Sequence, residues 1–248
     1  MQSRPDNESY WVSFYSYKGG VGRTLTMVNV ANRLCKMGRK VLLVDFDLEA
    51  PGLNEFSELA PQKEEKGVLE LLDLIHRGEN PNIEDFICKI YQRDTLGQML
   101  VLHAGDHKNP IYQDLLRDNR SLLDEFTDCE RGDSTISRFK KVISECKPDF
   151  VFVDSRTGIT EIGGICTCEL ADLNVMVSSF NKQNVNGIAK VKDAILKFRE
   201  RGGKKADFIH ILSPKPTFDK PVSDDHIDEK DPIYSGRKFS TAGSERLS

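Results

Sequence analysis

A glycine-rich segment near the start of the sequence constrains the fold more than any other feature. It runs from Ser16 to Thr24, with the sequence SYKGGVGRT. An apolar run over residues 11–15 precedes it and predicts a buried strand, and a helical pattern over residues 24–37 follows it and stops at Gly38. Such a turn exposes backbone N–H groups at the positive end of a helix dipole, where phosphate binds well. The segment therefore predicts a phosphate-binding loop between a strand and a helix.

Two positions of this loop depart from the common pattern, G-x-x-x-x-G-K followed by serine or threonine. Tyr17 stands in place of the first glycine, and Arg23 stands in place of the lysine. A further lysine, Lys18, opens the loop. This combination of departures is more informative than a clean match would be.

The composition allows one sizeable core. With 248 residues and 38% hydrophobic content, the chain can bury one α/β core, but it is short for two full domains. A net charge of -4 and a pI near 5.8 provide no bulk attraction to nucleic acid or to an anionic membrane. Six cysteines at irregular spacings favour reduced thiols in a cytosolic protein. The polar N-terminus lacks the pattern of a signal peptide, and no apolar run is long enough to span a bilayer.

Carboxylates follow two further apolar runs. The run over residues 41–44 ends in Asp45-Phe46-Asp47, at the carboxyl end of a predicted parallel strand, where open α/β sheets bind ligands. The alternative for Asp45 and Asp47 is turn formation or helix capping. The run over residues 150–153 ends in Asp154 and matches a Walker B strand, whose carboxylate reaches Mg²⁺. That pattern is weak alone and gains weight from the phosphate-binding loop.

The remaining chain alternates between strand and helix patterns. Residues 55–93 are predicted to be helical, with one amphipathic face over 68–75 and another over 83–90. Strands are predicted over 99–102, 173–177 and 208–212, and helices over 111–126, 134–146, 159–170 and 185–198. The alternation predicts an α/β fold, a mostly parallel twisted sheet with helices on both faces. Residues 1–213 form the expected domain, and the polar, proline-rich residues 214–248 are expected to be irregular or partly disordered.

These motifs together resemble the ParA/MinD ATPases. Residues 18–24 resemble their deviant Walker A motif, K-G-G-x-G-K followed by serine or threonine. Residues 45–47 resemble their second motif, and residues 150–158 resemble their Walker B strand with the loop after it. Order and spacing agree from about Val12 to Leu212. Arginine in place of the loop lysine resembles a sub-branch found in larger bacterial proteins, where the ATPase is joined to other domains.

The resemblance implies ATP and Mg²⁺ as ligands and gives residues their roles. Lys18 would reach across a face-to-face homodimer to the phosphates of the other subunit, and Asp47 would orient the attacking water. Mg²⁺ would be held by Thr24 and Asp154, with Asp45 supporting the metal shell. Nucleotide binding is implied for a larger set: Gly19, Gly20, Val21, Gly22, Arg23, Thr24, Leu25, Asn181, Ser213 and Pro214.

Two departures from the family pattern affect these roles. The lysine of the family pattern places a compact ammonium between the β- and γ-oxygens of the nucleotide. The planar guanidinium of Arg23 cannot take that position. We therefore hypothesise retained ATP binding with slow or partner-dependent hydrolysis. Family members often carry an asparagine that reads the adenine edge where this chain has Ser213-Pro214. Selectivity between ATP and GTP stays open.

Several other residues have a structural alternative beside a functional one. Cys166 and Cys168 resemble iron–sulfur ligands, but small buried cysteines on a helix are the favoured interpretation. His103 and His107 have a spacing that could suggest zinc, which the intervening Gly105 argues against. Arg156 is either a phosphate or partner contact or a surface charge. The basic residues at the end of the last helix, Arg199, Arg201, Lys204 and Lys205, are interpreted as a solvated helix end rather than a DNA contact.

The favoured function is a cytoplasmic ATP-dependent dimerisation switch that regulates a partner protein or an attached effector domain. One alternative is a nucleotide-binding scaffold that has lost catalysis, and another is a DNA-partitioning or positioning ATPase. The net negative charge of the chain does not favour nonspecific DNA binding, and no C-terminal amphipathic membrane helix is recognised. The polar tail suggests a fragment or a component of a larger assembly. The sub-branch resemblance alone suggests a role in bacterial defence against phage.

Overall fold

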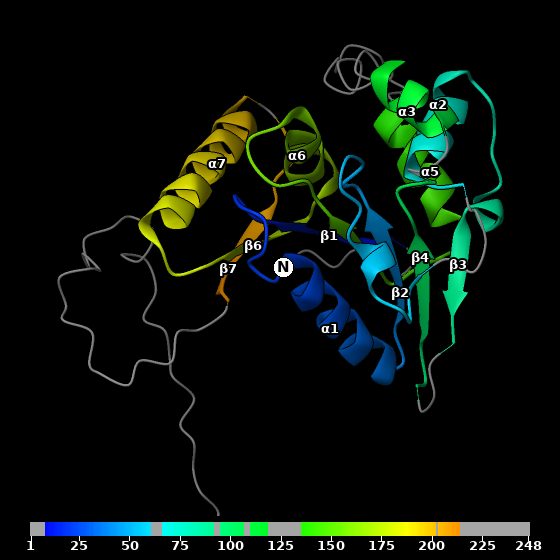
Figure 1. The fold of residues 1–248 in the computed structure, drawn as a ribbon, viewed down its shortest axis with the longest axis horizontal. Helices are drawn as coiled ribbons and strands as arrows, with labels where there is room; N and C mark the ends of the chain where they lie inside the picture. Colours follow the sequence, from blue (N-terminus) through cyan, green and yellow to red (C-terminus); the bar gives the residue numbers. More distant parts are fainter. Residues whose placement is uncertain are drawn as a thin grey trace, which may run out of the picture. The chain divides into compact units, whose positions relative to one another are not determined.

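A computed structural model describes residues 8–60, 66–91, 95–106, 110–118, 135–201 and 203–213. They form a seven-stranded sheet in the order β3-β4-β2-β5-β1-β6-β7 (Figure 1). The strands are β1 (Tyr10–Tyr15), β2 (Lys40–Asp45), β3 (Ile87–Ile90), β4 (Gln98–Leu102), β5 (Phe150–Asp154), β6 (Leu173–Ser178) and β7 (Asp207–Leu212). Every neighbouring pair is parallel except β3 and β4. The predicted mostly parallel sheet is confirmed.

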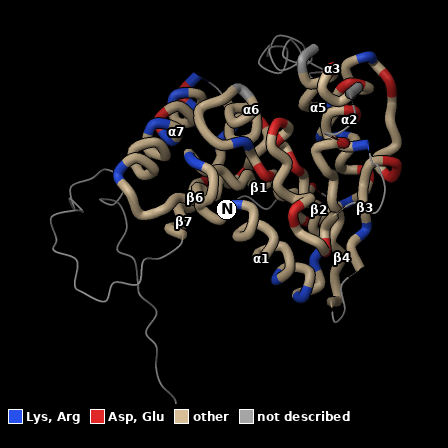
Figure 2. The backbone as a smooth tube through the Cα atoms, viewed as in Figure 1, with Lys and Arg blue, Asp and Glu red and all other residues tan. Residues whose placement is uncertain are grey.

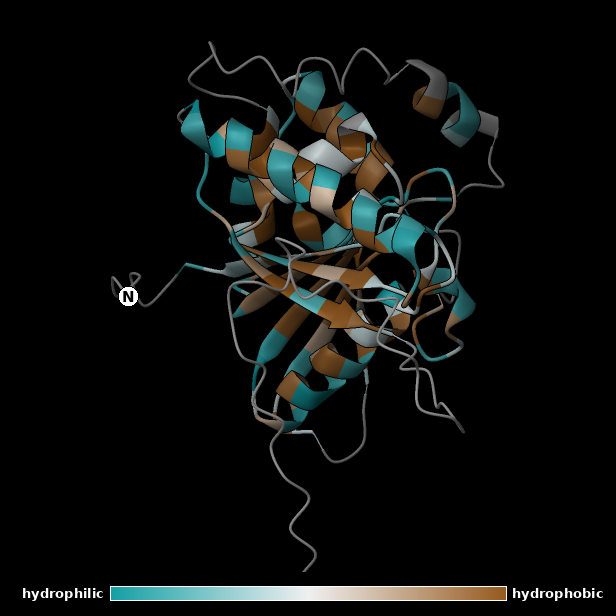
Figure 3. Ribbon diagram, turned by 90° about the vertical axis from the view of Figure 1, so that its left-hand side faces the viewer, coloured by the Kyte–Doolittle hydropathy of each residue, from teal (hydrophilic) through white to brown (hydrophobic). Residues whose placement is uncertain are grey.

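Helices cover both faces of the sheet. The helical segments are α1 (Arg23–Lys36), η1 (Leu53–Glu55), α2 (Val68–His76), η2 (Ile83–Asp85), α3 (Pro110–Asp118), α5 (Thr135–Ser144), α6 (Glu161–Gly164), the π-helix η3 (Ile165–Leu170) and α7 (Lys182–Glu200). One face packs against α1 and the η1 segment. The other face packs against α2, α3, α5, α6 and η3, with α7 beside them over β1 and β6. Figure 3 shows the apolar strands lying between these layers.

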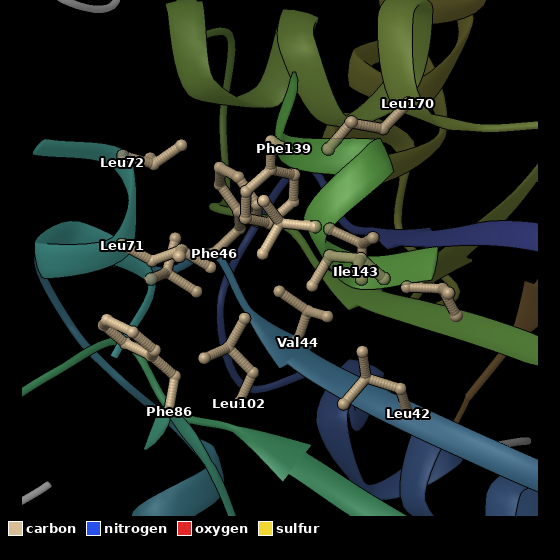
Figure 4. Packing of buried hydrophobic residues seen from close by; sticks show 14 of the residues in the cluster. Leu42, Val44, Phe46, Leu71, Leu72, Phe86, Leu102, Phe139, Ile143 and Leu170 are labelled. Carbon is tan, nitrogen blue, oxygen red and sulfur yellow. The ribbon is translucent and has the colours of Figure 1, made fainter. Parts of the chain in front are cut away.

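Alternation along the strands builds the two cores. In β2, Leu42 and Val44 lie in one cluster, while Val41 and Leu43 lie in the other. Successive side chains of a strand point to opposite faces, so a strand buried on both faces is a continuous apolar run. Figure 4 shows Leu42 and Val44 beneath Phe139 of α5. These packed layers fix the carboxyl ends of the central strands, where the predicted site residues lie.

The predicted helical face over residues 83–90 is wrong. Ile83 begins the short 3₁₀ helix η2, and residues 87–90 form β3, which pairs antiparallel with β4. Pairing with the outer edge of β4 satisfies backbone N–H and C=O groups that a short isolated helix would leave to water. The apolar residues that suggested one helix face therefore belong to two elements, with Ile83 and Phe86 buried in the core.

The helical prediction over 55–93 is also wrong for residues 56–60 and 77–82, which are turns or irregular chain on either side of α2. The elements predicted elsewhere agree in type where they are described, with small shifts at their ends. The helix predicted over 159–170 is the short α6 continued by η3. Only the first part of the helix predicted over 111–126 is described, as α3, and residues 119–134 lie outside the described residues. The described residues belong to one compact unit, Met1–Pro214. The predicted tail, residues 214–248, lies outside them, so the domain division stays a prediction. Within the described ranges, no helix is long and apolar enough to cross a membrane.

Candidate functional site

The loop between β1 and α1 is shaped by two glycines in the left-handed region. Gly20 has φ 73° and Gly22 has φ 82°, values that side chains rarely tolerate. Gly22 is also the N-cap residue of α1 and has no side chain to accept from the helix N–H groups. A Cβ placed on Gly19 or Gly20 would meet nothing within 4 Å. The loop therefore presents open backbone at a helix N-terminus, as the sequence predicts.

Three carboxylates meet at the carboxyl edge of the central strands. Asp45 ends β2 and lies opposite Asp154, which ends β5, and Asp154 lies opposite Phe14 of β1. Asp45 and Asp154 are fully buried, and Asp47 is nearly so. Since β5 lies between β1 and β2, this edge brings the carboxylates next to the glycine-rich loop. The predicted neighbourhood of the loop and the two aspartate motifs is present in the fold.

Arg23 joins two of these carboxylates. Its Nε donates to Asp154 Oδ1 over 2.5 Å, and its Nη2 donates to Asp47 Oδ2 over 3.2 Å. The side chain is 8% exposed, and its Nη1 is buried with no acceptor among the described residues. Burial acts to lower the pKa of Arg23, but the Asp154 and Asp47 carboxylates outweigh it and raise that pKa. The guanidinium is thus a fixed positive charge held by the two carboxylates, and its Nη1 is left without an acceptor among the described residues.

Thr24 and Asp45 have different partners at the same edge. Thr24 Oγ1 donates to Asp154 Oδ2 over 2.7 Å. Asp45 accepts from the backbone N–H groups of Asp47, Gly52 and Leu53, each over 3.1 Å. Burial and the nearby Asp154 raise the pKa of Asp45 to about 7, although the N–H groups of Leu53 and Asp47 oppose this. Asp45 therefore shapes the loop after β2, and its supporting role around a metal stays a prediction.

Tyr17 and Lys18 lie against α7. The exposed Lys18 donates from Nζ to Gln183 Oε1 over 2.6 Å. The Tyr17 ring lies on Gly187, where an added Cβ would be 2.1 Å from Tyr17 Cγ. Gln183 is four residues from Gly187, so both lie on one face of the helix. The sequence carries no motif that marks Gln183, and sequence reasoning missed it.

The remaining predicted nucleotide-binding residues are placed unevenly. Ser213 lies by the loop, since its Oγ would be 3.3 Å from a Cβ on Gly22. Asn181 instead caps α7, where its Oδ1 accepts from Asn184 N over 2.9 Å. The Leu25 side chain is 53% exposed, whereas Val21 is buried in the core. Pro214 lies outside the described residues.

Comparison with known proteins agrees with this geometry. A family model described as an AAA domain matches residues 9–206. The septum site-determining protein MinD of Buchnera aphidicola subsp. Schizaphis graminum is 28% identical over 196 residues, 76% of this chain and 60% of that protein. MinD of Escherichia coli K12 is 26% identical over 167 residues, 66% of this chain and 50% of that protein. The chain belongs to the ParA/MinD family of P-loop ATPases.

Solved structures of the ParA/MinD family share the fold. An ATP complex of a substituted Cyanothece McdA has a TM-score of 0.62 at 17% identity and covers 84% of this chain and 71% of its own. MinD with Mg-ADP from Pyrococcus horikoshii OT3 has a TM-score of 0.56 at 22% identity and covers 82% of this chain and 70% of its own. At such identities the likeness shows the fold alone.

The residues present fit the Mg²⁺ that ParA/MinD ATPases bind with nucleotide. Thr24 Oγ1 and Asp154 Oδ2 lie 2.7 Å apart, and both are the hard oxygen donors that Mg²⁺ prefers. In the described part of the chain, no group of three or more His, Cys, Asp or Glu side chains is placed to hold a metal ion. Mg²⁺ usually takes one or two protein oxygens and completes its shell with phosphates and water, so this pair suits a nucleotide-bound ion.

Two other candidates outside the ParA/MinD motifs are explained by packing. Cys166 is fully buried in the core, and burial raises the pKa of its thiol to about 12, so it stays protonated. Cys168 is half-buried beside α7. The cysteines of the described residues are all free, which fits the core interpretation. His107, the second histidine of the zinc alternative, lies outside the described residues.

Basic residues are frequent along α7 (Figure 2), and two near its end have partners within the protein. Arg199 donates to Ala206 O over 3.3 Å, and Lys204 forms an ion pair with Asp172 over 2.7 Å. Arg156, in the loop after β5, forms an ion pair with Glu49. These contacts favour structural roles for Arg199 and Lys204, while Arg156 links the loops that follow β2 and β5.

Proposed function

We propose that this chain binds ATP with Mg²⁺ at the β1–α1 loop, hydrolyses it slowly, and uses the bound state to dimerise. The dimer would regulate a partner protein or an attached effector domain. The observation that carries the proposal is the buried Nη1 of Arg23, which has no acceptor in the described part of the chain and belongs to the residue directly after the open glycine loop. An unpaired buried donor is costly, and a phosphate oxygen would satisfy it.

The roles follow from position and charge. Backbone N–H groups of Gly20, Gly22, Arg23 and Thr24 would bind the phosphates at the positive end of α1. Thr24 and Asp154 would hold Mg²⁺, which neutralises phosphate charge when bound. Asp47 would orient the attacking water, and Lys18 of the partner subunit would offset the charge that develops on the γ-phosphate.

The Arg23 ion pairs supply a physical reason for slow hydrolysis. Asp154 and Asp47 both accept from Arg23. Arg23 bonds one oxygen of each carboxylate and so fixes its orientation. Turning either carboxylate toward the metal or the water would break one of these bonds. A hydrogen bond to a charged group contributes about 1.5–3 kcal/mol, and about 1.4 kcal/mol is tenfold in rate. A reaction step that has to break one of these bonds would be slowed by about tenfold to a hundredfold.

Arg23→Lys tests this reason. A lysine ammonium keeps the charge but cannot reach two carboxylates with a planar fork, so we expect turnover to rise about tenfold with ATP affinity retained. Nucleotide titration and single-turnover hydrolysis would measure both. Arg39→Lys is the matched control, because the ion pair of Arg39 with Asp149 is exposed and 3.9 Å long. Isolated wild-type protein turning over on the order of 10 ATP per second, an ordinary enzyme rate, would contradict the proposal.

Two other functions keep some support. The engagement of both carboxylates by Arg23 favours a nucleotide-binding scaffold without catalysis, which the same turnover measurement separates from a slow ATPase. Relatives named for septum-site determination and chromosome partitioning favour an ATP-dependent positioning role. The Soj protein of Thermus thermophilus is 43% identical, but over only 61 residues, 25% of this chain and 23% of that protein. A role in defence rests on the motif resemblance alone.

A further inference from the structure

Lys18 is held by the chain's own helix α7. Its Nζ lies 2.6 Å from Gln183 Oε1, a short bond for an ammonium and a neutral amide. Next to it, the Tyr17 ring lies directly on the Gly187 backbone, with no room for even a methyl group between them. The two contacts lie one helical turn apart on the same face of α7. Together they fix the first half of the loop against the start of the helix.

The start of α7 is itself firmly anchored. Asn181 caps the helix by accepting from Asn184 N over 2.9 Å. Further along, Ile188, Val191 and Ile195 pack against Tyr15 of β1 and Met176 of β6. Because Tyr15 lies at the end of β1, immediately before the loop, α7 and the loop share one packed cluster. Gln183 is therefore presented to Lys18 by a rigid element, which makes a local contact an effective restraint.

We propose that Gln183 is a positioning residue that holds Lys18 within its own subunit in the nucleotide-free state. This inference rests on the proposed function, in which Lys18 leaves its own loop and reaches the nucleotide of a partner subunit. The Gln183 amide oxygen then competes with the partner's phosphates for the same ammonium. Dimer formation has to break the contact, so its strength sets how readily ATP converts monomer to dimer.

Changes at Gln183 should shift the equilibrium in both directions. Gln183→Leu removes the acceptor, so ATP should drive dimerisation more strongly, with a dissociation constant about threefold to tenfold lower. Gln183→Glu replaces the amide with a carboxylate, which holds the ammonium more tightly, so the dissociation constant should rise by a similar factor. Asn186→Leu is the matched control, since Asn186 is exposed on the same helix and takes no part in the site.

Two measurements on the full chain test the proposal. Competitive acetylation with mass spectrometry reports the reactivity of the Lys18 amine without nucleotide; we expect faster labelling in Gln183→Leu and slower labelling in Gln183→Glu. Sedimentation velocity with ATP and Mg²⁺ reports the dimer dissociation constant, with every variant carried in an Asp47→Ala background in which hydrolysis is blocked. Opposite shifts for the two Gln183 variants, absent in Asn186→Leu, support the inference.

The experiments distinguish a failure of this inference from a failure of the proposed function. Unchanged Lys18 labelling in Gln183→Leu overturns the inference. A normal ATP-dependent dimer whose dissociation constant does not respond to Gln183 also overturns the inference and leaves the proposed function standing. The absence of an ATP-dependent dimer in every protein, Asp47→Ala alone included, overturns the proposed function and this inference with it.

Discussion

At the scale of single residues, Arg23 distinguishes this loop from the lysine-bearing pattern. A guanidinium can donate from separate nitrogens to two acceptors in one plane, and Arg23 does so toward Asp154 and Asp47. Its charge also compensates two buried carboxylates. The residue therefore supports the fold as well as the proposed chemistry.

Arg23→Ala should destabilise the fold strongly. The substitution leaves Asp154 and Asp47 buried without their shared cation, and removing one partner of a buried pair costs about 3–5 kcal/mol. Urea denaturation would measure the free energy of unfolding. Arg39→Ala, which removes an exposed arginine of the 3.9 Å surface pair, should cost less than about 1 kcal/mol. Equal, small losses in the two variants would show that the Arg23 pairs do not stabilise the fold.

Local motifs predict some of these residues and not their partners. Gly20, Gly22 and Thr24 follow from the loop pattern, because strand–loop–helix geometry is set by near neighbours in the sequence. The pairing of Arg23 with Asp47 and Asp154 depends on β5 lying between β1 and β2, which the sequence does not state. Gln183 could not be predicted either, because its partner Lys18 is 165 residues away.

At the scale of elements, a lysine of α5 joins that helix to the end of η3. Lys140 Nζ donates to Glu169 O over 2.8 Å and lies 5.6 Å from the centre of the Trp11 ring. Lys204 and the Asp172 and Glu169 carboxylates also face it. Burial, together with the neighbouring Lys204, lowers the pKa of Lys140 to about 7. Above about pH 7 the Lys140 amine is therefore largely neutral in the folded protein, whereas in the unfolded chain it stays charged up to its ordinary pKa of 10.5.

This shift predicts how stability depends on pH. Between about pH 7 and the ordinary value of 10.5, the unfolded chain binds the Lys140 proton and the folded protein does not, so the free energy of unfolding rises with pH across that window. Lys140→Met removes this contribution and should flatten the rise. Denaturation at pH 6, 7, 8 and 9 would measure it, with the exposed neighbour Lys141→Met as the control. An identical pH profile for wild type and Lys140→Met would contradict the assignment.

The misassigned segment, residues 83–90, shows where apolar periodicity no longer distinguishes a helix from a strand. The apolar residues over 83–90 fit a helix face, yet the structure divides them between η2 and the edge strand β3. The four residues of β3 are too few for the spacing of their apolar side chains to separate helix from strand, and the available edge of β4 decides the outcome. The strands buried on both faces, such as β2, were predictable because continuous apolar runs are typical of them.

At the scale of the whole molecule, sheet order turns scattered motifs into one site. Placing β1 between β5 and β6 sets the loop beside Asp154 on one side and beneath α7 on the other. The sequence predicted this α/β class from alternation alone, because parallel strands joined by helices have few permitted arrangements. The chain spans 60% of the Buchnera MinD and 50% of the Escherichia coli one, so the activity of a whole protein stays a proposal.

One measurement tests the proposed switch most directly. Sedimentation velocity would give the mass of the Asp47→Ala protein in two conditions. One contains ATP and Mg²⁺, and the other contains ADP and Mg²⁺. With hydrolysis blocked and Lys18 intact, the Lys18 of each subunit should contact the phosphates of the ATP bound to the other subunit. ATP should therefore hold two subunits together, whereas ADP lacks the γ-phosphate. We predict a dimer with ATP and a monomer with ADP. The same mass with both nucleotides would contradict the dimerisation switch.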